Sequence, residues 1–76
     1  MRIQVLGTGC AKCKQLTANA QKAVAQLGLE VAVEKVEDVR EIMKFKVMST
    51  PALVVDGVVK STGKVLTPEA VRQLLG

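Results

Sequence analysis

The sequence predicts a small α/β fold with the element order β-α-β-α-β-β-α, in which helices cover both faces of a four-stranded mixed sheet. Short valine-rich segments, typical of strands, alternate with segments whose apolar residues recur at helical spacing. Asp56-Gly57 between the last two valine-rich segments is a strong hairpin signal, so these two strands should be antiparallel. With 76 residues, the chain should form one domain over positions 1–76.

The first strand and the first helix are predicted from the N-terminal residues. Ile3 to Leu6 is a short apolar strand that ends at Gly7-Thr8-Gly9. From there the apolar spacing becomes helical, and we expect a helix from about Ala11 to Leu27, with Gly28 as its C-terminal cap. Its apolar face carries Leu16, Ala20, Ala23, Val24 and Leu27.

The second strand is expected over Leu29 to Val36, where apolar residues partly alternate with glutamates. Leu29, Val31 and Val33 should face one side, and Glu30 and Glu34 the other. One polar face is typical of a strand at the edge of a sheet. The helix that precedes it makes a crossover connection, which predicts that this strand runs parallel to the first.

A short second helix should follow. Asp38 and Glu41 have the spacing of a capping box, which indicates the start of a helix. We expect this helix to end near Lys46 and to present Val39, Ile42 and Met43 as its apolar stripe. Val47 to Pro51 then breaks it.

The C-terminal part predicts a hairpin and a last helix. Ala52 to Val55 is entirely apolar, as expected of a central strand, and Asp56-Gly57 leads into a partner strand at Val58 to Lys60. After a loop through Gly63, Thr67 should cap a helix over Pro68 to Leu75, with proline in its favoured first position. This helix should bury Val71, Leu74 and Leu75.

The composition excludes several classes of function. The chain has no His, Trp or Tyr, which excludes histidine general-base chemistry, His-ligated zinc and aromatic base-stacking surfaces. Its net charge is +4, but the basic residues are scattered, so we expect no nucleic-acid partner. No membrane span or secretion signal is visible, and we expect a cytoplasmic monomer with no membrane partner and no cofactor or bound metal.

The two cysteines, Cys10 and Cys13, lie where the first strand ends and the first helix begins. A bridge between them would close a very short loop and stabilise the fold little, so chemistry explains the pair better than structure does. Unpaired N–H groups and the positive end of the helix dipole favour a thiolate at Cys10. Lys12 and Lys14 add modest support.

The pair is asymmetric, which suits dithiol exchange. Cys13 heads the apolar stripe of the helix and should be the more buried sulfur. Cys10 would attack a target disulfide, and Cys13 would resolve the mixed disulfide, within the separation that a Cys10–Cys13 disulfide requires. Two other interpretations stay open: a pair of structural thiols, and a four-cysteine zinc site shared across a dimer.

Pro51 begins the predicted central strand, a position where proline is unusual unless it comes first or lies in a tight turn. The Thr50–Pro51 bond could be cis and permit a sharp approach, or an ordinary trans bond that ends the preceding helix. The local sequence alone favours trans.

Taken together, these residues resemble the thioredoxin-like superfamily over essentially the whole chain. The resemblance rests on the Gly7-Thr8-Gly9-Cys10-Ala11-Lys12-Cys13 turn and on Thr50-Pro51-Ala52-Leu53-Val54-Val55-Asp56-Gly57. The best match is the group of very small bacterial and archaeal redox-active disulfide proteins. The resemblance implies a minimal thioredoxin fold, with Cys10 as nucleophile, Cys13 as resolving thiol, and a cis Pro51 beside the sulfurs. It also implies that Thr50, Pro51, Ala11 and Lys12 bind the substrate.

The partners that the resemblance implies are a disulfide reductase of the thioredoxin-reductase kind, as electron donor, and a disulfide-bearing target protein. The sequence departs from ordinary thioredoxins at several points. Gly9 takes the place of a tryptophan, and Ala11-Lys12 replaces Gly-Pro. No aspartate occurs in the first strand, where Gln4 stands, so water or another group must accept the proton of the resolving thiol. Lys60 to Lys64 replaces the glutathione-holding element of glutaredoxins, which disfavours glutathione chemistry.

The alternative is a heavy-metal-associated domain, which residues 1–36 also resemble. Such domains bind Cu(I) through two soft thiolates in a Cys-X-X-Cys loop after the first strand. Two features disfavour this interpretation. Thr8 stands where these domains usually carry methionine, and the predicted order ends on a helix, whereas those domains end on a strand.

Overall fold

The computed structural model describes residues 2–8 and 11–75, and these form the predicted order of elements. The strands are β1 (Ile3–Leu6), β2 (Val33–Val36), β3 (Ala52–Val55) and β4 (Val58–Thr62), and the helices are α1 (Ala11–Gln26), α2 (Val39–Lys44) and α3 (Pro68–Leu75). The sheet order is β2-β1-β3-β4. β1 is parallel to β2 and antiparallel to β3, and β3 is antiparallel to β4. The mixed sheet, the edge position of β2 and the central position of β3 are confirmed.

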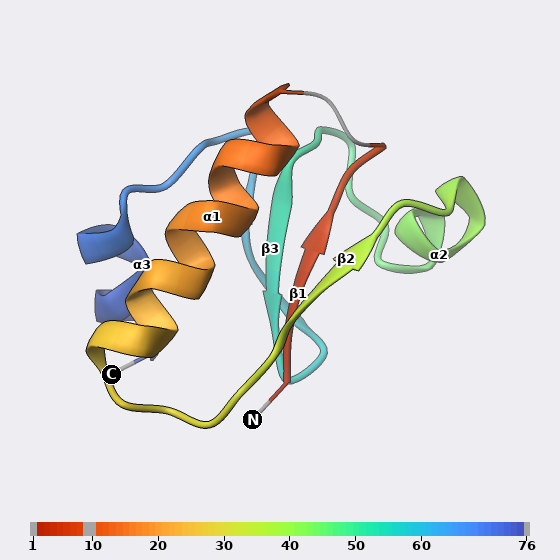
Figure 1. The fold of residues 1–76 in the computed structure, drawn as a ribbon. Coiled ribbons are helices and arrows are strands. Elements are labelled where there is room, and N and C mark those ends of the chain that lie inside the picture. Colours follow the sequence, from red (N-terminus) through yellow and green to blue (C-terminus); the bar gives the residue numbers. More distant parts are fainter. Residues whose placement is uncertain (1, 9–10, 76) are drawn as a thin grey trace.

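The helices cover both faces of the sheet, as predicted. α1 and α3 lie on one side and α2 on the other (Figure 1). Each side has its own core because successive strand residues point to opposite faces. The core under α1 and α3 consists of Ile3, Val5, Leu16, Ala20, Ala23, Val24, Leu53 and Val71. The core under α2 consists of Leu6, Ile42, Ala52 and Val54.

The second strand is shorter than the prediction of Leu29 to Val36. Only Val33–Val36 is strand, and it pairs residue for residue with β1, from Ile3↔Val33 to Leu6↔Val36. The structure places no β1 residue opposite 29–32, because β1 itself begins at Ile3. The predicted face is nevertheless right, since Leu29, Val31 and Val33 all pack against the core under α1.

The turn after α1 and the hairpin follow their local signals. Gly28 has a φ of 67°, Gly28 N donates to Ala25 O and Leu29 N donates to Val24 O, which is a Schellman cap. The helix stops at Gln26, so Leu27 is 40% exposed rather than on the buried face. Asp56 and Gly57 have φ values of 51° and 80°, as a type I′ turn requires, and β4 continues to Thr62.

The helix α2 begins as predicted but is shorter and more exposed. The Asp38 side chain accepts a hydrogen bond from Arg40 N. The Glu41 carboxylate instead forms a salt bridge with Lys44 Nζ and does not close a capping box. The helix ends at Lys44 because Phe45 caps it and Lys46 takes a φ of 57°. Of the expected stripe only Ile42 is buried, and Val39 and Met43 are 57% and 68% exposed, since only one side of this short helix meets the sheet.

The helix α3 has the predicted cap. Thr67 Oγ1 accepts a hydrogen bond from Ala70 N, and Pro68 is the first helical residue. Val71 is fully buried and Leu75 packs partly against the core. Leu74 is 40% exposed, contrary to the prediction, because it lines the open groove between α3 and β4.

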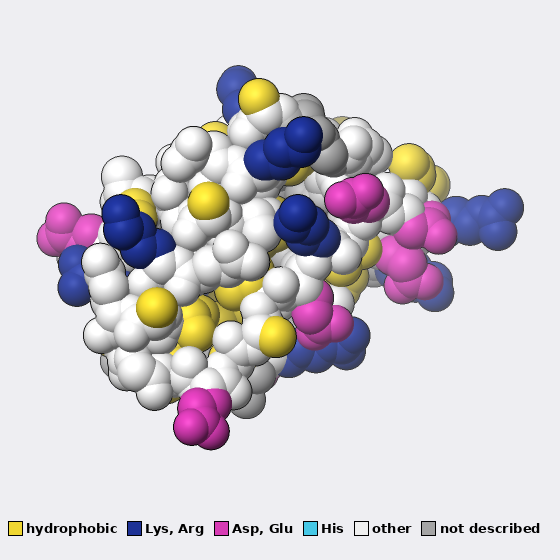
Figure 2. Space-filling view, viewed as in Figure 1, with side chains coloured by type: hydrophobic (Ala, Val, Ile, Leu, Met, Phe, Trp, Pro, Cys, Tyr) yellow, Lys and Arg dark blue, Asp and Glu magenta, His cyan; other side chains and the backbone are white. Residues whose placement is uncertain are grey.

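The charged side chains do not collect into one patch on the face drawn in Figure 2. Lys and Arg side chains are interspersed there with Asp and Glu and with uncharged surface. This matches the scattered distribution of basic residues along the sequence.

Candidate active site

The predicted site lies at the end of the sheet where β1 leads into α1. Gly7 and Thr8 follow β1, and α1 begins at Ala11. Gly9 and Cys10 lie outside the described residues, so the expectations for Cys10 stay predictions. Ala11 and Lys12 are described, and both are exposed on the first turn of α1.

Cys13 is buried, with 5% of its surface exposed. It lies in the first turn of α1 and heads the stripe Leu16, Ala20 and Val24, which packs on the sheet. The Cys13 carbonyl accepts a hydrogen bond of 2.9 Å from Thr17 Oγ1. The expected burial of this sulfur is therefore found.

Gly7 lies directly against the Cys13 side chain. A Cβ built on Gly7 would overlap Cys13 Sγ and would stand 3.0 Å from Cys13 Cβ. The same position is 3.9 Å from Thr50 Cβ. Gly7 therefore marks the place where the end of β1, the first turn of α1 and the loop before β3 meet.

The loop before β3 brings Thr50 and Pro51 to this place. The Thr50–Pro51 peptide bond is cis, Pro51 is fully buried and Thr50 is exposed. Pro51 O accepts a 2.8 Å hydrogen bond from Gly63 N, which ties the loop to the residue after β4. Thr50 is thus held at the surface next to Gly7 and Cys13.

A cavity of about 30 Å³ adjoins Cys13 on the side of the edge strand β2. Its wall includes Val5, Gly7, Lys14, Thr17, Lys35 and Glu37. Lys35 and Glu37 were not among the residues singled out in the sequence. Their position could have been inferred from strand alternation, in which every second side chain faces the same side of the sheet. Val33 faces the core under α1, and Lys35 and Glu37 are two and four residues further on.

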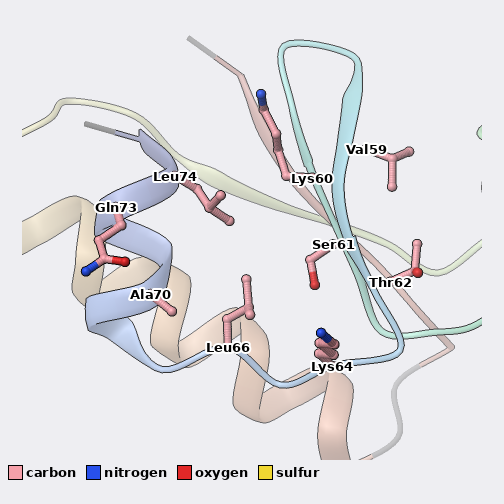
Figure 3. A pocket seen from close by; sticks show the side chains of 9 residues that line it. All are labelled: Val59, Lys60, Ser61, Thr62, Lys64, Leu66, Ala70, Gln73 and Leu74. Atoms are coloured by element: carbon pink, nitrogen blue, oxygen red, sulfur yellow. The ribbon is translucent and has the colours of Figure 1, made fainter.

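The two larger hollows lie elsewhere. One, of about 560 Å³, separates β4 from α3, with Ser61, Leu66 and Ala70 among the side chains around it (Figure 3). The other, of about 650 Å³, lies on the α2 face and includes Arg2, Glu34 and Asp38. Neither includes Cys13, Thr50 or Pro51.

Residues 2–8 and 11–75 contain neither a metal-binding cluster nor a membrane-spanning helix. Within these ranges, no group of three or more His, Cys, Asp or Glu side chains is arranged to hold a metal ion. In the same part of the chain, none of the helices combines the length and the apolar character needed to cross a membrane.

Comparison with known proteins agrees with this geometry. A family model described as "Thioredoxin domain" matches residues 1–76. A protein named thioredoxin from Methanothermobacter thermautotrophicus is 39% identical over 75 residues, covering 99% of this chain and 97% of that protein. A protein named thioredoxin from Methanocaldococcus jannaschii is 40% identical over 73 residues, covering 96% of this chain and 84% of that protein. The chain therefore belongs to the thioredoxin domain family.

Proposed function

We propose that this chain is a thiol–disulfide oxidoreductase that exchanges a Cys10–Cys13 dithiol with the disulfide of a protein or small-molecule partner. Family membership supports an oxidoreductase function of this general type. The observation that carries this dithiol mechanism is the position of Cys13, which is buried in the first turn of α1 against Gly7. A buried second thiol suits resolution of a mixed disulfide, because a bulky target cannot reach it first.

In the reducing direction the exchange has two steps. The Cys10 thiolate attacks one sulfur of the target disulfide, and the other target sulfur leaves as a thiolate. The Cys13 thiolate then attacks the Cys10 sulfur, which forms the Cys10–Cys13 bond and releases the second target thiolate. Two electrons pass from the dithiol to the target, and a disulfide reductase must return them.

The surface around the pair suits an extended partner segment. Thr50 is exposed beside Gly7, and Ala11 and Lys12 are exposed on the first turn of α1. We propose that these residues and Pro51 contact the target, with the Thr50 backbone pairing with it. We propose further that the chain works as a single cytoplasmic domain, with a reductase of the thioredoxin-reductase kind as donor.

The Cu(I)-carrier alternative is disfavoured by the architecture. A heavy-metal-associated domain would continue β-β-α-β after its first helix, whereas this chain continues β-α-β-β-α and ends on α3. A metal-carrying loop would not require the Thr50–Pro51 segment, whose Thr50 lies beside Gly7.

The test is a disulfide turnover assay on insulin, with dithiothreitol as the electron source, on the parent, Cys10→Ser and Cys13→Ser. We expect turnover by the parent, none by Cys10→Ser, and a mixed disulfide trapped on Cys13→Ser that mass spectrometry detects. Turnover by Cys10→Ser at the parent rate would falsify the mechanism. Stoichiometric Cu(I) uptake without any turnover by the parent would favour the metal carrier instead.

A further inference from the structure

The resolving step requires the buried thiol of Cys13 to lose its proton. A thiolate, not a thiol, attacks a disulfide, and burial among apolar groups disfavours the thiolate. Cys13 is 5% exposed, lines a small cavity together with Val5 of the core, and shares the buried face of α1 with Leu16. A proton acceptor within reach of the sulfur would remove this obstacle.

The first strand does not supply that acceptor. Among the β1 residues, Ile3 and Val5 face the core under α1, where Cys13 lies, whereas Leu6 faces the core under α2. Gln4 alternates with Val5, so it faces the opposite side of the sheet, and it is not among the residues that line the cavity at Cys13. A carboxamide would in any case be a poor proton acceptor.

The neighbouring edge strand does place ionisable groups at the sulfur. Lys35 is the partner of Val5 in the β1–β2 register and so shares its face. Gly7 N donates a 2.9 Å hydrogen bond to Val36 O, which holds the end of β2 beside Gly7. Glu37 follows at once. Lys35 and Glu37 are exposed at the surface, where they line the small cavity that Cys13 adjoins and also border the larger hollow on the α2 face.

We propose that Glu37 accepts the proton of Cys13 through a water molecule in this cavity during the resolving step, an assignment that rests on the proposed function. The cavity, at about 30 Å³, has room for one water, and the polar side chains in its wall, among them Thr17 and Glu37, offer that water partners. The charged groups facing it are Lys14 from α1 and Lys35 and Glu37 from the β2 side. Of these, only the carboxylate can accept a proton, while the two ammonium groups stabilise the thiolate that is left.

The proposed step balances as follows. The Cys13 thiol gives its proton to the water, which gives one of its own to the Glu37 carboxylate. The Cys13 thiolate attacks the Cys10 sulfur of the mixed disulfide and forms the Cys10–Cys13 bond. The target sulfur leaves with the electron pair of the broken bond, and the proton on Glu37 passes to solvent or to that leaving thiolate.

The experiment follows the two steps separately with dithiobis(nitrobenzoate) added to an excess of reduced protein. The first nitrobenzoate thiolate released reports attack by the more reactive thiol, and the second reports resolution. Cys13→Ser, which should show only the first phase, assigns the phases. Glu37→Gln is compared with Glu30→Gln, which removes the same charge from an exposed glutamate outside the cavity.

We expect Glu37→Gln to slow the second phase about tenfold near pH 6.5, and the deficit to shrink as the pH rises towards about 8.5, where hydroxide takes over. The first phase and Glu30→Gln should keep parent rates, and Glu37→Asp should recover part of the loss.

A slowing that is equal at every pH would indicate a structural role and overturn the proposal. A faster second phase would also overturn it, because it would mean that the anion only repels the thiolate. If the parent releases no second thiolate, the proposed function fails, and this inference fails with it.

Discussion

Gly7 and Cys13 are in such close contact that the structure leaves no room for a side chain at position 7. A Cβ there would overlap Cys13 Sγ and would stand 3.0 Å from Cys13 Cβ. The φ angle of Gly7 is not among the positive values found in this chain, so its glycine is required by this contact and not by a left-handed backbone. The end of β1 and the first turn of α1 can therefore lie this close together only because residue 7 has no side chain.

Gly7→Ala should therefore destabilise the protein by about 1–3 kcal/mol, the usual cost of forcing an extra methyl group into a packed interior. The new methyl group must displace Cys13, and with it the first turn of α1. Chemical denaturation of the reduced protein measures the loss of unfolding free energy.

The matched control for Gly7→Ala is the same substitution in a Cys13→Ala background. Removing the sulfur removes the main clash, so Gly7→Ala should cost clearly less there than in the parent. Equal costs in the two backgrounds would show that the penalty comes from somewhere other than the Cys13 side chain.

The parts of the fold that were predictable from the sequence are those with a local physical cause. Gly28 caps α1, Asp56-Gly57 turns the hairpin and Thr67 caps α3, each through backbone geometry that needs only neighbouring residues. The length of β2 was not predictable in this way. It is limited by where β1 begins, which is a property of the partner strand.

The candidate site was only partly predictable for a similar reason. The helical stripe predicted that Cys13 is buried, because burial follows from periodicity within one helix. The contact of Gly7 with Cys13, and the presence of Lys35 and Glu37 near the sulfur, depend on how α1 lies across the strands. Spacing within one segment carries no information about that arrangement.

Met48 offers a test of the proposed target-binding surface. Its side chain is 98% exposed and lies two residues before Thr50 in the chain. If a target protein docks beside Thr50, it should cover part of this apolar side chain. Met48→Ala should then lower kcat/KM for reduction of insulin about fivefold, which corresponds to about 1 kcal/mol of lost apolar contact.

Two comparisons make the Met48 result specific. The rate with a small disulfide should not change, because such a substrate does not reach beyond the sulfurs. Met43→Ala, which truncates another exposed methionine (68%) on α2, should leave insulin reduction at the parent level. Equal effects of the two substitutions would argue against a docking surface at Met48.

Asn19 connects α1 to the loop before α3. Its Nδ2 donates a 2.8 Å hydrogen bond to Leu66 O in a half-buried position, and its Oδ1 accepts one of 3.0 Å from Gln15 Nε2. Asn19→Ala leaves the Leu66 carbonyl without this donor and should cost about 1 kcal/mol, or a fall in Tm of about 4–8 °C for a domain of this size. Gln21→Ala, at an exposed position of the same helix, should change Tm by much less.

Arg2 and Glu34 make the pH dependence of stability predictable. Arg2 Nε and Nη2 donate hydrogen bonds of 2.7 and 3.2 Å to the Glu34 carboxylate, joining the residue before β1 to β2. The hydrogen bond from the Arg2 side chain, with a smaller contribution from its charge, lowers the pKa of Glu34. A carboxylate whose pKa is lower in the folded state stabilises the fold above its unfolded pKa of about 4.3 and loses that contribution as the pH falls through the folded value.

Glu34→Gln should therefore melt at a lower temperature than the parent at about pH 7, and the difference in Tm should shrink as the pH falls below about 4.3 and vanish once the parent carboxylate is protonated as well. Added salt should also reduce the difference at neutral pH, since both side chains are exposed to solvent. Thermal melts of the parent, Glu34→Gln and the exposed control Glu30→Gln across this pH range provide the measurement. A difference in Tm that persists unchanged at the acid end would mean that Glu34 acts through packing of its side chain and not through its charge.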